Sequence, residues 1–228
     1  LAVPVVGDED ELMGIVTVDD VIDVIRDENT EDMLRMAGTG DVELGALSAW
    51  RNTRARAPWL FASLCGGIAA AWVIGQFEGE LAQLAALTAF IPVIMGMGGN
   101  IGTQSSTIVV RGLATGEVDL QEGWKVIRRE LATGLALGTL YGVLLGVFAK
   151  IQHWTTDPTS LYFVRFPFVV AIAIAANMVL AASLGTLIPI ALKRMRVDPA
   201  IATGPFVTTA IDVLGILFYF MLARVILF

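Results

Sequence analysis

Five apolar segments dominate the 228-residue sequence, and each is close to or longer than the roughly 20 residues that cross a bilayer as a helix. We place them at Trp59–Phe77, Leu81–Val110, Val126–Ala149, Phe166–Leu192 and Ile201–Phe228. Charged residues make up only 16% of the chain, whereas soluble domains carry about 25%. The sequence therefore predicts an all-α polytopic membrane protein with five transmembrane helices.

Two of these spans are rich in glycine. The second contains Gly96, Gly98, Gly99 and Gly102, and we expect the helix to be interrupted or bent near its middle, where it would line a wet cavity or be buried in protein. In the third span a glycine recurs at every fourth position from 134 to 146. This spacing predicts a smooth helix face that a neighbouring helix can approach closely.

The first 45 residues form an acidic segment that differs from the rest of the chain. They hold 13 acidic and two basic residues, a net charge of −11, whereas the remaining residues hold nine acidic and 13 basic residues, a net charge of +4. The overall charge of −7 argues against nucleic acid as a partner. The single cysteine, Cys65, excludes an intrachain disulfide and a cysteine metal cluster.

Within this acidic head the pattern predicts a strand, a turn, a second strand and a helix. The strands are expected at Leu1–Val6 and Leu12–Val18, and Thr17 or Asp19 is expected to cap the helix that follows. So short an α/β segment cannot bury a core by itself. We therefore expect it to be part of a larger domain.

Basic residues in the loops predict the orientation in the membrane. Ten of them flank the spans on the side of the acidic head, whereas Lys150, Arg165 and Arg224 lie on the other side. By the positive-inside rule the head is cytoplasmic and the C-terminus lies outside, in a cell membrane.

Asp212 lies well inside the fifth span, with no basic residue within one helical turn. A carboxylate at such depth costs about 2.5 kcal/mol or more, so it marks a functional site by default. Thr208 lies one turn earlier on the same helix face, and Pro205 is expected to free a backbone carbonyl near Ile201. Hydroxyl, carbonyl and carboxylate oxygens together suit a hard cation.

Polar residues also interrupt the second and fourth spans. The segment from Gly96 to Thr107 brings Asn100, Thr103 and Gln104 into a helix that should otherwise be apolar. A pathway for water and ions is the interpretation that fits best beside Asp212. For Asn177, in the fourth span, we expect a hydrogen bond to another helix.

The acidic head contains a dense run of carboxylates between residues 19 and 32. Such a run is usually a solvated face, but like charges three and four residues apart on a helix repel each other, and a divalent cation would relieve that repulsion. Clusters of oxygen ligands suit Mg²⁺ or Ca²⁺ rather than zinc. The sequence contains no H-E-x-x-H or G-x-S-x-G motif, and we expect no enzymatic activity and no catalytic residues.

Three segments carry a resemblance to a known family. Gly14–Val21 resembles the closing strand and helix of a CBS domain, Pro92–Ser106 resembles the Gly-Gly-Asn signature of the MgtE magnesium transporters, and Gly204–Asp212 resembles the motif in their last helix. The resemblance implies a homodimeric, Mg²⁺-selective and Mg²⁺-gated channel in the cell membrane, with five helices per subunit and a pore on the dimer axis.

The resemblance also implies roles for segments and residues. Residues 1–36 would be the C-terminal part of a CBS domain, 37–57 a connecting plug helix, and 58–228 the pore domain. The implied pore residues for Mg²⁺ are Asp212, Thr208, Gly204, Gly96, Gly99, Asn100 and Thr103. The implied cytosolic Mg²⁺ sensor consists of Asp20, Asp23, Glu28, Glu31 and Asp32. The implied partners are a second copy of the chain, the lipid bilayer, Mg²⁺ and other divalent cations, and ATP through the complete CBS domains.

The residues leave two alternatives open. One is a membrane-anchored nucleotide sensor without conduction, since Thr17 and Asp20 fit the Thr-x-x-Asp pattern of CBS domains. The other is a proton-coupled exchanger of divalent cations, with Asp212 as the titrating group. A simple anchor has no use for a deep carboxylate, which favours transport. The selectivity among Mg²⁺, Mn²⁺, Co²⁺ and Ca²⁺ is open as well.

Overall fold

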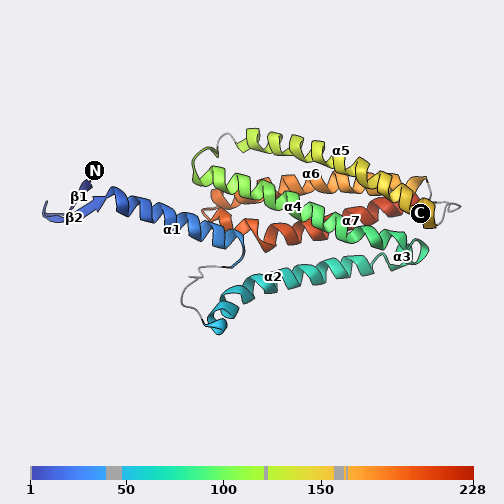
Figure 1. Cartoon of the computed structure of the whole chain (residues 1–228), viewed down its shortest axis with the longest axis horizontal. Coiled ribbons are helices and arrows are strands. Elements are labelled where there is room, and N and C mark those ends of the chain that lie inside the picture. Colours follow the sequence, from blue (N-terminus) through green and yellow to red (C-terminus); the bar gives the residue numbers. More distant parts are fainter. Residues whose placement is uncertain (1, 40–47, 121–122, 157–161, 163) are drawn as a thin grey trace.

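Five long apolar helices form the body of the chain (Figure 1). The structure is a computed structural model that describes residues 2–39, 48–120, 123–156, 162 and 164–228. The five helices are α2 (Ala49–Gly75), α4 (Ala86–Ala114), α5 (Gly123–Thr156), α6 (Arg165–Arg194) and α7 (Pro205–Leu227). Each contains a stretch long and apolar enough to cross a membrane, which confirms the predicted multi-pass membrane fold.

The acidic head follows the predicted order of elements. Strand β1 (Ala2–Val6) pairs with β2 (Leu12–Thr17) as an antiparallel hairpin, with Ala2 opposite Thr17, and α1 (Val18–Met36) follows directly. Thr17 is the N-cap: its hydroxyl accepts from the Asp20 backbone N–H at 3.3 Å, and the Asp20 carboxylate accepts from the Thr17 N–H at 2.7 Å. This reciprocal capping box stabilises the first turn of α1, whose residues are all solvent-accessible.

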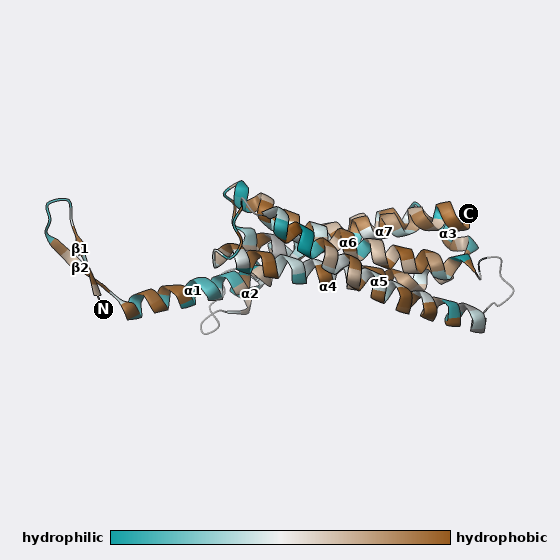
Figure 2. Ribbon diagram, turned by 90° about the horizontal axis from the view of Figure 1, so that it is seen from above, coloured by the Kyte–Doolittle hydropathy of each residue, from teal (hydrophilic) through white to brown (hydrophobic). Residues whose placement is uncertain are grey.

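Helix α6 lies at the centre of the bundle. It packs against α5 on one side and against α4 and α7 on the other, while α2 packs on α7 at the opposite flank (Figure 1). The hydrophobic colouring in Figure 2 runs along the whole bundle, and α1 extends from one of its ends. The C-terminus of α7 lies at the other end.

The glycines of α5 let it approach α6 closely, as predicted. A Cβ atom added at Gly138 would lie 2.7 Å from the Ala175 carbonyl oxygen, and one at Gly142 would lie 2.6 Å from that of Ala171. Side chains therefore cannot be accommodated on this face without moving backbone. Small residues supply the close van der Waals contact that holds helices together in a membrane.

The predicted interruption in the middle of the second span is wrong. Helix α4 runs without a break through its glycines, and the break comes before it, at Leu84 and Ala85, where the short helix α3 (Glu78–Gln83) ends. Two of the glycines serve packing instead: Ile211 of α7 fills the space beside Gly98 and Gly102. Because neighbouring helices occupy the missing side-chain positions, the helix needs no irregular backbone there.

The fifth span begins later than predicted. Pro199–Thr203 form a 3₁₀ turn, η1, and α7 starts with Pro205 in its first turn. Proline is tolerated there because the first helical N–H groups have no intrahelical acceptor, so Pro205 does not free a carbonyl inside a helix as we expected. At the start of the first span, residues 49–57 of the predicted connecting helix run continuously into α2 through Pro58. Residues 40–47 of that segment lie outside the described residues.

Asn177 forms the predicted hydrogen bond between helices. Its side-chain amide is buried and donates to the Ile94 carbonyl oxygen of α4 at 2.7 Å. Its own oxygen lies against Gly215 of α7. One side chain of α6 therefore contacts both α4 and α7, the two helices that carry the conspicuous intramembrane polar residues.

The glycine contacts predict a sharp difference between two alanine substitutions. At Gly185 an added methyl group would collide with the Gly102 carbonyl oxygen, whereas at Gly67 it would meet nothing within 4 Å. We expect Gly185→Ala to destabilise the bundle by about 1–3 kcal/mol through overpacking. Gly67→Ala is expected to be neutral or stabilising, by up to about 1 kcal/mol, through helix propensity. Thermal unfolding in detergent measures both, and equal melting temperatures would contradict the packing described here.

Candidate ion pathway and cation-sensing segment

Asp212 occupies the middle of α7 and is half-buried. Its neighbours along the helix are apolar, and Ile211 beside it is fully buried against α4. Among the ion pairs and hydrogen bonds of the described residues, none involves the Asp212 carboxylate. A carboxylate at this depth without a protein partner is available to a ligand.

A polar stripe on α4 lies next to this part of α7. We use this name for Gly96, Asn100, Thr103 and Gln104, which follow one another at helical spacing. Gly96, Asn100 and Gln104 are exposed on the single chain, and Thr103 is half-buried. The structure thus presents two amide side chains on the surface of the apolar helix α4 in the single chain.

Thr208, one turn before Asp212, lies beside Gly99 of α4. A Cβ atom added at Gly99 would lie 4.0 Å from the Thr208 methyl group, so α4 and α7 are in contact at this point. The Thr208 hydroxyl donates weakly to the Pro205 carbonyl at 3.3 Å and lies one turn before Asp212. Gly99 and Thr208, one predicted pore residue from each helix, therefore lie next to each other.

Gly204 occupies a different position from the other predicted pore residues. It lies at the start of α7, and a Cβ atom there would be 3.5 Å from the Met36 carbonyl oxygen at the end of α1. Gly38 follows α1 with a left-handed backbone, φ 68°, and lies close to Pro205. The end of the acidic helix therefore touches the beginning of the helix that carries Asp212.

The five predicted sensor residues do not form one cluster. Asp20 caps α1, and the hydrogen bonds from Thr17 lower the pKa of its carboxyl. Glu31 pairs with Arg35 on the same helix. Within the described residues, no three histidine, cysteine or acidic side chains lie close enough together to hold a metal ion.

Glu28 and Asp32 line a groove between α1 and the bundle. The groove encloses about 510 Å³ and is also lined by Asp198, which precedes η1, and by Lys193 of α6. Burial raises the pKa of the Asp32 carboxyl, and the negative charges of Asp198 and Glu28 raise it further. Glu28, Asp32 and Asp198 thus line one groove together with Arg35 and Lys193, but in this arrangement the three carboxylates do not lie close enough together to hold a metal ion.

An ion pair joins the two sides of this groove. Arg35 of α1 pairs with Asp198, whose other oxygen accepts from the Ala200 N–H at 2.9 Å and so caps η1. The sensor segment and the turn before α7 are therefore linked directly by charge. Asp198 was not among the predicted site residues because it lies in a loop far from the acidic run in sequence.

Glu130 is a second membrane carboxylate that the sequence analysis missed. It is only 6% exposed, and its carboxylate accepts from the Ser105 hydroxyl of α4 at 2.8 Å. It lies near the start of the predicted span Val126–Ala149, directly after Arg128 and Arg129, and it forms an ion pair with Arg129 at 3.8 Å. The absence of a nearby basic residue, which singled out Asp212, therefore does not apply to Glu130. Unlike Asp212, it is buried against a hydroxyl donor.

Comparison with known proteins places these features in a family. The sequence matches the profile of the MgtE divalent cation transporters over residues 91–222, which includes the polar stripe and Asp212. It is 38% identical over 223 residues to the magnesium transporter MgtE of Bacillus subtilis strain 168, a match that covers 98% of this chain and 48% of that protein.

Two further relatives match to a similar extent. The magnesium transporter MgtE of Thermus thermophilus is 39% identical over 231 aligned positions, covering 98% of this chain and 48% of the relative. That of Enterococcus faecalis is 36% identical over 223 residues, covering 98% and 47%. The chain therefore spans about half the length of these relatives. With the matched profile extending over more than half of its residues, the chain belongs to the MgtE family of divalent cation transporters.

Proposed function

We propose that this chain forms the pore and part of the cytosolic sensor of a Mg²⁺-selective channel that cytosolic Mg²⁺ closes. The observation that carries the proposal is a carboxylate, Asp212, without a protein partner among the described residues, half-buried at membrane depth beside a polar stripe. The relatives are named as magnesium transporters, which supports Mg²⁺ as the transported ion. Mg²⁺ is the cargo of this site.

The donor set suits a hydrated Mg²⁺ ion. Mg²⁺ loses its water reluctantly and is usually held by one or two carboxylates while it keeps several waters. Asp212 supplies charge, while Thr208, Asn100 and Thr103 supply hydroxyl and amide groups that hydrogen-bond to those waters. Gly96 and Gly99 leave room on the pore side of α4 because they carry no side chain.

A second copy of the chain would complete the pathway. In one subunit the polar stripe is exposed, and polar side chains exposed to lipid are costly. Pairing two subunits across a two-fold axis removes both stripes from lipid and places two Asp212 carboxylates around one ion. We therefore propose a homodimer with the pore on its axis, the head in the cytoplasm and the C-terminus outside.

The contacts of α1 support a mechanism for closing. Without Mg²⁺, the carboxylates of Glu28, Asp32 and Asp198 repel one another, and the ion pair of Arg35 with Asp198 opposes that repulsion. Mg²⁺ bound between these carboxylates would pull α1 towards η1. Because α1 ends against Gly204, this movement acts on the start of α7. Each bound ion biases a two-state equilibrium by its difference in affinity for the two states.

Asp23 and Asp20 lie further along α1, away from the bundle. We propose that they, with Glu31, contact Mg²⁺ that is shared with the rest of a CBS domain, to which β1, β2 and α1 would belong. The apolar side chains Val21, Ile22 and Ile25 are about half exposed, as expected for a helix that packs on further elements of such a domain. Regulation by ATP would also require those elements.

The two alternatives make different demands on Asp212. A nucleotide sensor without conduction would not need it, and membership in a cation transporter family favours transport. A proton-coupled exchanger would need it to release a proton for each cation cycle. Flux measured with and without an imposed proton gradient separates the exchanger from the channel.

We expect Asp212→Asn to lose most Mg²⁺ flux, because the amide keeps the size of the side chain and removes its charge. Mg²⁺ uptake into liposomes by the full-length protein, read with an internal fluorescent indicator, measures this. Asp212→Ala is expected to abolish the flux. Normal uptake by either variant would refute the pore assignment.

Glu130→Gln is the matched control for the loss of a membrane carboxylate. Its amide oxygen can still accept from the Ser105 hydroxyl, and it belongs to α5 rather than to α4 or α7, the helices of the proposed pathway. We expect this variant to keep at least half of the wild-type flux. An equal loss of flux in Asp212→Asn and Glu130→Gln would mean that the protein needs both membrane carboxylates in order to fold. Protein yield and melting temperature of the two variants would reveal such a folding defect.

If the proposed dimer forms, cysteines introduced on the polar stripe should cross-link two copies of the chain, and cysteines on the outer face of α5 should not. In a Cys65→Ala background, Asn100→Cys places a thiol on the polar stripe, and Leu135→Cys places one on the outer face of α5, where Leu135 is 60% exposed. A short bis-maleimide reagent in proteoliposomes is expected to give a covalent dimer with the first variant and not with the second. A monomeric mass with intact flux would exclude the dimer.

Neutralising the proposed sensor is expected to keep the channel open at high cytosolic Mg²⁺. The variant changes Asp20, Asp23, Glu28, Glu31 and Asp32 to Asn or Gln in the full-length protein. Repulsion between solvated carboxylates is only about 1 kcal/mol per pair, so the loss of ligands should outweigh it. Open probability across a series of Mg²⁺ concentrations measures the effect.

The matched control neutralises the four acidic residues of the β1–β2 turn, Asp8 to Glu11, which lie in the same head. We expect its Mg²⁺ inhibition curve to equal that of the wild type. An unchanged curve in the sensor variant would show that the cluster is only surface charge.

A further inference from the structure

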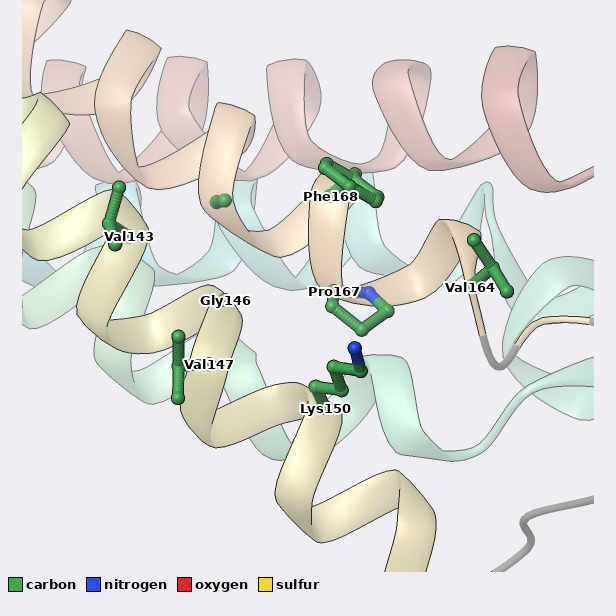
Figure 3. Close-up of a pocket in the computed structure, with 8 residues that line it drawn as sticks. Val143, Gly146, Val147, Lys150, Val164, Pro167 and Phe168 are labelled. Atoms are coloured by element: carbon green, nitrogen blue, oxygen red, sulfur yellow. The ribbon is translucent and has the colours of Figure 1, made fainter.

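The lipid-facing flank of the bundle contains an apolar groove that ends at a single cation. The groove lies between α5 and α6, encloses about 350 Å³ and is lined by apolar or small residues except for Lys150 (Figure 3). From Val143 to Lys150 it follows two turns of α5, about 10 Å at the rise of an α-helix. None of the residues of the polar stripe, which belongs to α4, lines this groove.

The groove exists because small residues form its floor. Gly146 of α5 lacks a side chain, and an added Cβ atom would lie 3.0 Å from that of Ala171 on α6. Val147 of α5 and Phe168 of α6 stand on either side, and both are more than half exposed. The close helix crossing thus leaves a hollow between two apolar walls.

Lys150 lies at the end of this hollow and is exposed. In Figure 3 its side chain lies along the groove, with the amine near Pro167. No carboxylate in the described part of the chain forms an ion pair with it. An ammonium that has no ion pair among the described residues, beside an apolar groove, is complementary to a molecule with an anionic head and a hydrocarbon tail.

We propose that this groove binds one phospholipid, with an acyl chain between Val147 and Phe168 and the phosphate at Lys150. A lysine stem packs along apolar surface while its charged end stays at the membrane interface, where it meets phosphate as a point charge. A second copy of the chain fits less well, because the rest of this outer surface of α5 is a continuous apolar face typical of lipid contact. Leu140, Leu144 and Ile151 on it are each more than half exposed.

Native mass spectrometry of the protein in mild detergent, titrated with phosphatidylglycerol or phosphatidylcholine, tests the proposal. We expect one phosphatidylglycerol per subunit to bind before any other lipid, and Lys150→Gln to weaken that binding about five-fold, the effect of one basic residue near an anionic lipid. Val147→Trp, which fills the groove, is expected to weaken binding of both lipids. Leu135→Trp adds the same side chain elsewhere on α5 and is expected to leave binding unchanged.

Three results would overturn the proposal. Equal affinity for phosphatidylglycerol in the wild type and Lys150→Gln would show that Lys150 does not contact the lipid head group. Unchanged lipid binding in Val147→Trp would show that the groove does not hold the acyl chain. A shift from dimer to monomer in Val147→Trp would show that a second copy, and not a lipid, occupies this face. Lys150→Gln is a surface change and keeps the test valid even if the tryptophan variant fails to fold.

Discussion

Close contact between small residues is what the whole bundle depends on. In hydrocarbon there is no hydrophobic force to push helices together, so they associate through van der Waals packing at short range. The chain meets this requirement twice: the glycines of α5 meet the alanines of α6, and Gly102 of α4 meets Gly185 of α6. With α6 held from both sides, α4 and α7 acquire fixed positions.

Those fixed positions decide where polar groups can be placed. Buried Asn177 contacts both α4 and α7, and Ile211 fills the space beside the glycines of α4. The rotation that turns Ile211 inwards leaves Asp212, the next residue, half-buried at the edge of the bundle. The proposed ion site is thus a consequence of how α7 packs.

The connection between head and bundle is polar where the bundle itself is apolar. Arg35 and Asp198 form the ion pair, and the carboxylates of Glu28 and Asp32 share the same groove. Partly exposed charges respond to ions in solution, whereas glycine contacts do not. An apolar, closely packed bundle joined to a charged head is compatible with the ion-regulated channel proposed above.

The amino-acid sequence alone determined the five spans, the acidic head and the capping residues around Thr17, and it predicted a functional site at Asp212. These follow from the composition, from the spacing of apolar residues along the chain and from the free-energy cost of placing a charged side chain in a membrane, all of which are properties of short stretches of sequence. Only the tertiary structure decided that α4 is unbroken, that Asp198 joins Glu28 and Asp32, that Glu130 is held by Ser105, and that Lys150 ends an apolar groove. Each of these depends on which residues distant in sequence lie together, because the space beside a glycine and the surroundings of a carboxylate are set by other helices.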